Sequence, residues 1–133
     1  MWTRKGRKDG VYCYIKREGF ATGRATFAGY STREILAVGG QVGTDPHSGI
    51  LCDGVHEQLR QAMTNVKELL EEAGSSFADV VMLHVYLTEH GHFREMNQVL
   101  SEFLAEPFPA RTTAYVQLPP DMLVEVDALA VLQ

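Results

Sequence analysis

The sequence lacks any long hydrophobic run and contains few cysteines. No stretch of about 18 apolar residues occurs in the chain, so a membrane-spanning helix is not expected. The basic segment 1–10 has no apolar core behind it, and we therefore expect no secretory signal. The two cysteines, Cys13 and Cys52, have no CxxC spacing. They are expected to be free thiols in a reducing compartment, with the cytoplasm as the expected location.

Motifs for covalent, phosphate and metal chemistry are also missing. No GxSxG occurs, so covalent catalysis by a serine of that type is unsupported. The glycines at positions 39, 40 and 43 do not lead into a helix, which excludes a GxGxxG fingerprint and a P-loop. His90 and His92 have no cysteine or carboxylate at ligand spacing, whereas a structural zinc site needs four ligands. We therefore expect no metal site.

Charge is distributed unevenly along the chain. Residues 1–34 contain eight Lys/Arg and three Asp/Glu, a balance of +5, whereas residues 35–133 contain four and fourteen, a balance of −10. Such a basic arm either binds nucleic acid or a membrane surface, or is a solvated leader on an acidic domain. The arm lacks the alternating aromatic residues of a base-stacking platform and any nucleic-acid recognition motif, so we favour the solvated leader and expect no nucleic-acid or membrane partner.

Hydrophobic periodicity predicts two helices and at least five strands in one domain. The helices are expected at 56–73, capped by Asp53 and ended at Gly74, and at 92–104, capped by Thr88 or a neighbour and stopped by Pro107. Phe93 and Met96 are expected on the inner face of the second helix. The strands are expected at 25–31, 34–43, 79–88, 111–118 and 123–132, with a further edge strand at 10–16.

The strand 79–88 indicates how the chain assembles. Val81, Leu83, Val85 and Leu87 alternate with Val80, Met82, His84 and Tyr86, so both faces are largely apolar. Two helices can cover only one face of the sheet. We therefore expect a homo-oligomer that buries the other face, with His84 half-buried at an interface.

Two features carry the candidate chemistry. The paired glycines Gly39 and Gly40 in a strand predict either a bulge with close packing or a backbone N–H that is open to a ligand. Arg111 is the last cation of the chain and begins a strand, where a guanidinium suits a two-point grip on a carboxylate. Glu125 and Asp127 share one face of the last strand, and such carboxylates are costly to bury without a partner or a role.

If 111–118 and 123–132 form a hairpin, Arg111 lies opposite Val131 and about 20 Å from Glu125. The two residues could then serve one small site only across an oligomer interface. This leaves two interpretations equally open, because Arg111 either grips a substrate there or pairs with an acid of a neighbouring subunit for assembly alone.

The chain resembles the RidA (YjgF) family of imine/enamine deaminases. The matching segments are GGQVGTDPHSG (39–49), LRQAMTNVKELLEEAG (59–74), DVVMLHVYLTE (79–89), FREMNQVLSEFL (93–104), FPARTTA (108–114) and VEVDALAV (124–131). The PAR element followed by the VEV strand is the specific part. The likeness covers residues 25–133 and leaves 1–24 as a basic N-terminal arm.

The resemblance implies an α+β, chorismate-mutase-like fold, with a mixed sheet and two helices packed on one face. It also implies a homotrimer with three clefts between subunits. The implied reaction is hydrolysis of reactive 2-imino acids or their enamines to 2-oxo acids and ammonia, without a cofactor or metal.

By position in this family, Arg111 is implied to bind the substrate carboxylate and Glu125 to position or activate water. Gly40 is implied to lie against the ligand and Asn97 to lie near the cleft. Three positions depart from common family residues, namely Gly39 (often Ser), Thr113 (often Cys) and Thr26 or Phe27 (often Tyr). These departures put substrate range and rate in doubt more than reaction type. The alternatives are a non-catalytic trimer that binds small carboxylates or a protein, and an RNA-binding protein that affects translation.

Overall fold

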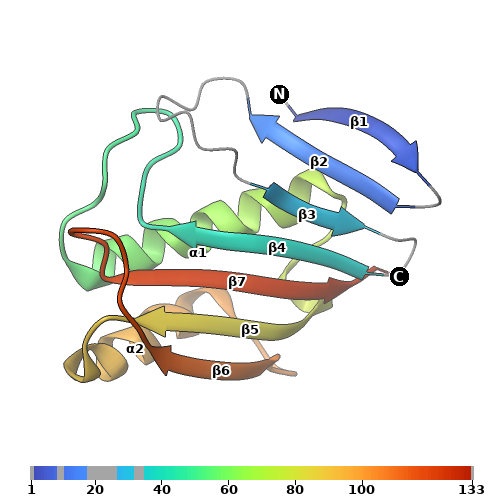
Figure 1. The fold of residues 1–133 in the computed structure, drawn as a ribbon. Coiled ribbons are helices and arrows are strands. Elements are labelled where there is room, and N and C mark those ends of the chain that lie inside the picture. The colour runs from blue at the N-terminus through green and yellow to red at the C-terminus, as the bar shows by residue number, and fades with distance from the viewer. Residues whose placement is uncertain (1, 9–10, 18–26, 32–34, 133) are drawn as a thin grey trace.

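The computed structural model describes residues 2–8, 11–17, 27–31 and 35–132, with side chains described for 35–132. Figure 1 shows the order of the elements. They are β1 (Trp2–Lys8), β2 (Val11–Arg17), β3 (Phe27–Ser31), β4 (Ile35–Val42), α1 (Gly54–Glu72), β5 (Val80–Leu87), α2 (Phe93–Phe103), β6 (Ala110–Tyr115) and β7 (Val124–Val131), with short 3-10 helices at Phe77–Asp79 and His90–His92. The strand expected at 10–16 is present as β2, but β1 forms the edge beyond it. The division between residues 24 and 25 stays a prediction.

The described strands form one seven-stranded sheet in the order β1-β2-β3-β4-β7-β5-β6. Among the described strands, the β5–β6 pair alone is parallel, because α2 crosses over between these two strands. The predicted hairpin of 111–118 with 123–132 is therefore wrong, since β5 lies between β6 and β7. The crossover carries β6 to the outer side of β5, and β7 returns into the space between β5 and β4.

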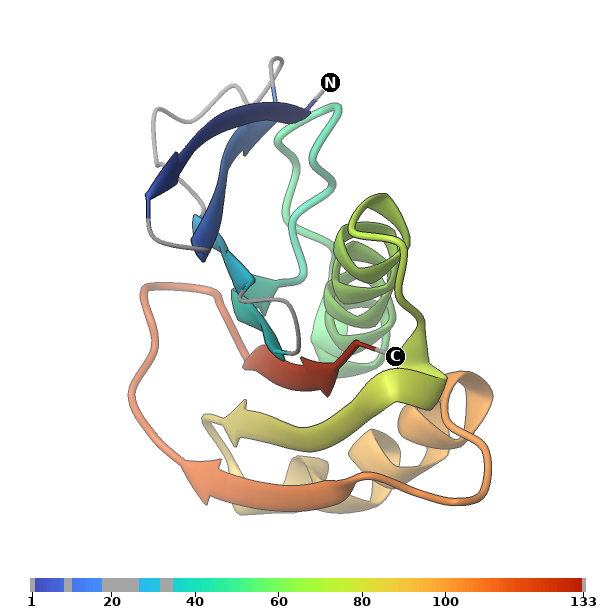
Figure 2. The same cartoon turned by 90° about the vertical axis from the view of Figure 1, so that its right-hand side faces the viewer.

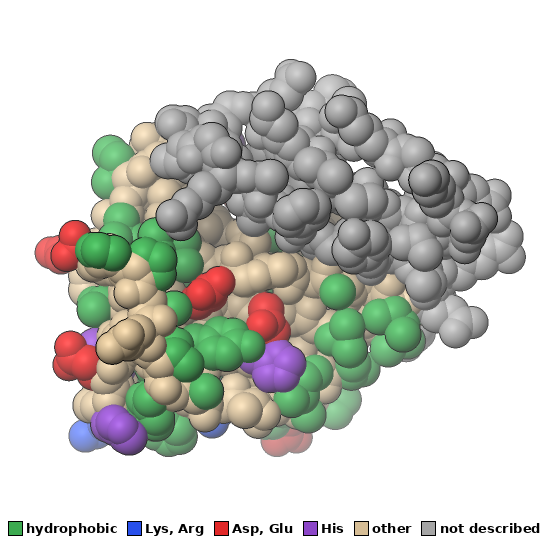
Figure 3. Space-filling view, in the orientation of Figure 1, with side chains coloured by type: hydrophobic (Ala, Val, Ile, Leu, Met, Phe, Trp, Pro, Cys, Tyr) green, Lys and Arg blue, Asp and Glu red, His purple; other side chains and the backbone are tan. Residues whose placement is uncertain are grey.

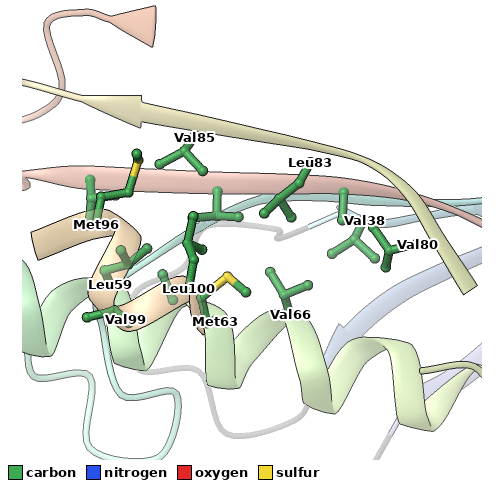
Figure 4. Packing of buried hydrophobic residues seen from close by; sticks show 14 of the residues in the cluster. Val38, Leu59, Met63, Val66, Val80, Leu83, Val85, Met96, Val99 and Leu100 are labelled. Atoms are coloured by element: carbon green, nitrogen blue, oxygen red, sulfur yellow. The ribbon is translucent and has the colours of Figure 1, made fainter. Parts of the chain in front are cut away.

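Both helices lie on the same side of the sheet (Figure 2). The predicted α+β class, with a mixed sheet and two helices on one face, is confirmed. Figure 4 shows strand residues such as Leu83 and Val85 directed toward Met63 and Val66 of α1 and toward α2. The described core comprises Leu36, Val38, Val55, Leu59, Ala62, Met63, Val66, Leu70, Val80, Leu83, Val85, Leu87, Met96, Val99, Leu100, Val124, Val126, Ala128 and Ala130. None of the described helices is long and apolar enough to cross a membrane.

The helix ends agree with the sequence in part. Asp53 occupies the N-cap position of α1, although its side chain makes no capping hydrogen bond. Gly74 follows the C-cap of α1 with φ +78°, as expected for a left-handed terminating residue. The cap expected at Thr88 is wrong, because His92 precedes α2 and the Thr88 hydroxyl donates to the Leu123 carbonyl instead.

Two buried amides of α1 fix the loops beside the sheet. The Asn65 side chain donates to the carbonyls of Val42 and Thr44, at 3.1 and 3.0 Å. The Gln58 side chain donates to the Asp121 carbonyl at 2.9 Å and accepts from the Leu123 backbone N–H at 2.8 Å. The end of β4 and the start of β7 are thereby held against α1.

The second face of the sheet, here called the open face, is not covered by any described helix (Figure 2). On β5, Leu83, Val85 and Leu87 point toward the helices, whereas alternate residues point to the open face. An irregularity at the start of β5 buries Val80 and exposes Val81, which reverses the predicted directions of these two residues. The exposed hydrophobic residues on or beside this face are Ile35, Val81, Leu129 and Val131. Assembly through this face stays a prediction.

Candidate functional site

The paired glycines of β4 form a bulge. Val38 pairs with Ala128 and Gln41 with Val126, so Gly39 and Gly40 together lie opposite one residue of β7. The Gln41 side chain donates to the carbonyls of Gly39 and Gly40, at 3.0 and 3.3 Å. The Gln41 amide therefore donates hydrogen bonds to two glycine carbonyls at the bulge, where the regular pairing of β4 with β7 is interrupted.

The Glu125 carboxylate packs directly on this bulge. A Cβ atom at position 40 would lie 2.0 Å from Glu125 Oε1 and 2.8 Å from its Cδ. Real Cβ atoms do not approach other atoms so closely, so this position of Glu125 requires glycine at 40. The glycine is needed for the close packing of a candidate catalytic side chain.

The environment of Glu125 favours its protonated form. Partial burial, and then the negative charge of Asp127, raise the pKa of the Glu125 carboxyl above its ordinary value of 4.5. A carboxyl group with a raised pKa is a stronger base when ionised and still a usable acid when protonated. Glu125 therefore has the properties of a proton-transfer group.

Arg111 belongs to a second group of residues, on the edge strand β6 and on α2. Its Nη1 atom donates to Asn97 Oδ1 at 2.8 Å, and its guanidinium carbon lies 5.8 Å from the centre of the Phe93 ring. Phe93 is 41% exposed, so its expected place on the inner face of α2 is wrong. Thr113 Oγ1 lies 3.7 Å from Met96 Sδ in the same region. Arg111 is thus held by α2 with its end exposed.

The two groups lie on opposite faces of the sheet. Arg111 is in register with Leu83, which is buried under the helices, so Arg111 points to the helix side of the sheet. Glu125 lies between the buried Val124 and Val126 and therefore points to the open face. Leu83 also pairs with Ala128. Arg111 and Glu125 are therefore two strands and three residues apart, about 14 Å between backbones. Within one chain they cannot contact the same small molecule.

We call these groups the arginine half-site (Arg111, Asn97, Phe93, Thr113) and the glutamate half-site (Glu125, Gly39, Gly40). The structure joins Arg111 with Asn97, and Glu125 with Gly40. The candidate residue Thr26 lies outside the described residues. Phe93 was not expected at the site, and the PAR element gives no sign of its contact with Arg111.

Sequence reasoning placed Asp127 on the face of Glu125 but did not predict its hydrogen bonds to β5. Asp127 Oδ1 accepts from His84 Nδ1 at 2.5 Å, and its Oδ2 accepts from the Tyr86 hydroxyl at 3.0 Å. Figure 3 shows acidic and histidine side chains close together on the open face, among hydrophobic ones. A signal for these contacts was available in the sequence, because His84 and Tyr86 lie on one face of their strand and Glu125 and Asp127 lie on one face of theirs. Within residues 35–132, no group of three or more His, Cys, Asp or Glu side chains is arranged to hold a metal ion.

Comparison with known proteins defines the class of this small α+β protein. A family model described as Endoribonuclease L-PSP matches residues 24–132. The chain therefore belongs to this family, which is the RidA/YjgF family expected from the PAR and VEV elements.

Three similar proteins illustrate the range of the family. A RutC family protein of Pyrococcus abyssi is 43% identical over 97 residues, which are 71% of this chain and 76% of that protein. The 2-iminobutanoate/2-iminopropanoate deaminase of Bos taurus is 41% identical over 98 residues, 72% of each chain. The crystal structure of E. coli TdcF with bound serine is 27% identical, with a TM-score of 0.79, and the match covers 90% of this chain and 98% of that one.

Proposed function

We propose that this protein hydrolyses reactive 2-imino acids, or their enamine tautomers, to 2-oxo acids and ammonia. The observation that carries the proposal is that one small fold presents both an exposed arginine held by α2 and, on the opposite face of the sheet, a carboxyl group of raised pKa. An imino acid needs one group to bind its carboxylate and another to move protons at its carbon–nitrogen bond.

Arg111 binds the substrate carboxylate in this proposal. The Asn97 side chain accepts from one guanidinium nitrogen and the Phe93 ring lies against the group, which limits its rotamers. A planar guanidinium that is oriented in advance can form two parallel hydrogen bonds to a carboxylate. The reacting carbon of a small substrate is then fixed in one pose.

Glu125 moves the protons. Its ionised carboxylate accepts a proton from water as the water oxygen bonds to the imine carbon. The second electron pair of the C=N bond moves to the nitrogen, which takes that proton from the Glu125 carboxyl, so a neutral carbinolamine forms and Glu125 is ionised again. The carboxyl group then relays a proton from the new hydroxyl to the nitrogen. The C–N bond breaks, ammonia leaves and a C=O bond forms, with no change in oxidation state overall.

We further propose that the chain assembles as a homotrimer in which an arginine half-site of one subunit faces the glutamate half-site of the next. Two observations support this. The half-sites lie on opposite faces of one chain, and the open face carries exposed hydrophobic residues such as Leu129 and Val131. Burying such a face against copies of the same chain removes apolar surface from water.

Two relatives bear on the substrate class. The bovine relative has the name of a 2-iminobutanoate/2-iminopropanoate deaminase, and the TdcF structure contains serine, which offers the α-carboxylate that Arg111 would bind. The name of the Pyrococcus abyssi relative gives only a family. The cytoplasm is the location we expect for this activity, close to the enzymes that release such imines.

The test is a coupled assay with a threonine dehydratase, in which semicarbazide traps the free imine. Adding the wild-type protein should reduce semicarbazone formation and increase the rate of 2-oxo acid release. Glu125→Gln should bind a carboxylate inhibitor but leave trapping unchanged. Unchanged trapping with the wild type would reject the deaminase activity for that substrate. Equal activity in Glu125→Gln would remove the proposed role of Glu125, and a carboxylate ligand bound without any effect on trapping would favour the non-catalytic alternative.

A further inference from the structure

The open face carries four neighbouring ionisable side chains, of which the proposed reaction uses only Glu125. His84 pairs with Asp127 across β5 and β7, and Tyr86 pairs with Glu125. Directly opposed residues of antiparallel strands have Cβ atoms about 5 Å apart, and diagonal neighbours about 7 Å. Each of these groups is therefore close enough to influence the charge of the others.

Asp127 is held on both of its oxygens. The His84 ring donates from Nδ1 to Oδ1 at 2.5 Å, and the Tyr86 hydroxyl donates to Oδ2 at 3.0 Å. A carboxylate oxygen accepts hydrogen bonds, and both oxygens of Asp127 are occupied by donors from β5. The Glu125 carboxylate has no hydrogen-bond partner among the side chains of residues 35–132. Asp127 is therefore the carboxylate that its neighbours hold in place, and Glu125 is the carboxylate whose oxygens are open to water or substrate.

Within residues 35–132, Glu125 is surrounded by side chains of β7, β5, β4 and β6. Asp127 lies two residues along β7, Tyr86 lies across on β5, and His84 lies diagonally. On the other side, β4 presents Gly40 and Val42, neither of which titrates. Beyond β5, the strand β6 presents Thr112 and Ala114 to this face, while Arg111 points to the helices. Among the side chains of residues 35–132, the charges near Glu125 on this face are thus those of Asp127 and of a protonated His84.

We propose that His84, Asp127 and Tyr86 form a positioning network that sets the proton affinity of Glu125 and thereby the pH range of the reaction. This inference rests on the proposed deaminase function, because it assigns the network to that same carboxyl. With His84 neutral, the Asp127 anion favours a proton on Glu125 and makes its ionised form a stronger base. With His84 protonated, the two charges offset each other and Glu125 loses its proton more easily.

The network predicts shifts of opposite sign for two nearly isosteric substitutions. Asp127→Asn removes the anion, so Glu125 should titrate at a lower pH than in the wild type. His84→Gln removes the cation but keeps a hydrogen-bond donor, so the anion is no longer offset and Glu125 should titrate at a higher pH. Tyr86→Phe changes no charge at neutral pH and should give the smallest shift. A purely structural role would not produce this pattern.

The experiment follows the Glu125 carboxyl carbon by NMR in protein labelled with ¹³C-glutamate, and identifies its signal as the one missing from Glu125→Gln. The titration midpoint is measured in the wild type and in the three variants, all of which keep Arg111. The expected result is a lower midpoint in Asp127→Asn and a higher one in His84→Gln. Equal midpoints, or shifts of the same sign, would overturn the proposal.

A kinetic readout then connects the network to the reaction. The acid limb of kcat/KM should move with the NMR midpoint, to lower pH in Asp127→Asn and to higher pH in His84→Gln. The plateau kcat of Asp127→Asn should fall by roughly threefold to tenfold, because a less basic Glu125 is a weaker general base. A wild-type protein without deaminase activity would reject the proposed function, whereas the NMR titration would still decide whether the network acts on Glu125.

Discussion

The Glu125 carboxylate occupies the space that a side chain at position 40 would need, with Oε1 only 2.0 Å from the site of a Cβ atom on Gly40. A methyl group there would have to displace the end of the glutamate side chain. The backbone of β4 and the core beneath it would not have to move. This contact joins the β4 bulge to the candidate catalytic group.

Gly40→Ala is therefore expected to impair activity while leaving the fold intact. Displacing a proton-transfer group by about 1 Å can reduce the rate by roughly a hundredfold. The matched control is Gly43→Ala, whose Cβ would lie 2.4 Å from the Gln58 Cα and 2.7 Å from the Gln58 carbonyl oxygen, both backbone atoms. That variant should lose about 1–3 kcal/mol of unfolding free energy. Denaturant unfolding and kcat measurements on both variants check the prediction, and a Gly40→Ala enzyme with wild-type kcat contradicts it.

Arg111→Ala should reduce kcat/KM by roughly a hundredfold, since hydrogen bonds to a charged group contribute about 1.5–3 kcal/mol each. Arg111→Lys should recover only part of the loss, because an ammonium group cannot make two parallel bonds. Arg94→Ala on α2 is the control for a general loss of positive charge. All three should remain folded by circular dichroism. Equal losses in Arg94→Ala and Arg111→Ala would show that the effect is only electrostatic attraction.

The pH dependence should follow the raised pKa of Glu125. Burial and the Asp127 charge both favour the protonated form, so activity that needs the ionised carboxylate should decline on the acid side from a pH above 4.5. The acid limb should disappear in Glu125→Gln, whose residual rate should vary little with pH in this range. Steady-state kinetics of the wild type and of Glu125→Gln between pH 4 and 8 measure the acid limb. The same limb in Glu125→Gln would assign it to another group.

Gln58→Ala tests how the loops beside the site are held. It leaves the Leu123 N–H and the Asp121 carbonyl without their partner, which should cost about 1–3 kcal/mol of unfolding free energy. Gln98→Ala on the exposed face of α2 should cost little. Thermal unfolding of the two variants at one pH gives the comparison. A loss of the same size in both would mean that the Gln58 bonds contribute nothing specific.

Much of the fold could be predicted from periodicity, and the exceptions have identifiable causes. The apolar stripe of α1 and the alternation in β5 and β7 determined the elements and their buried faces. The neighbours of β6 could not be predicted, because a strand that follows a helix can pair on either side of β5. Gln58 and Asn65 lie within the apolar stripe of α1, seven residues apart, and this position was an available signal that they have buried partners.

The sequence named candidate site residues, which stay a prediction, but it could not give their geometry. The paired glycines predicted either a bulge with close packing or a backbone N–H open to a ligand, and the structure contains the bulge. Arg111 and Glu125 were expected to lie far apart within a chain, but the reason given, the length of a hairpin, was wrong. They are separated because strand β5 lies between their strands and because they point to opposite faces of the sheet. The contact of Phe93 with Arg111 depends on the crossing of α2 over β6, which no local pattern encodes.

A mixing experiment tests most directly whether Arg111 and Glu125 act together between chains. Arg111→Ala and Glu125→Gln should each be nearly inactive, and co-expression in equal amounts should produce mixed assemblies, whose composition is verified by native mass spectrometry. If each site takes its arginine from one subunit and its glutamate from the next, about one quarter of the sites regain both residues. Recovery of about a quarter of wild-type activity is the predicted result. Activity no higher than that of the separate variants, in verified mixed assemblies, would contradict the account.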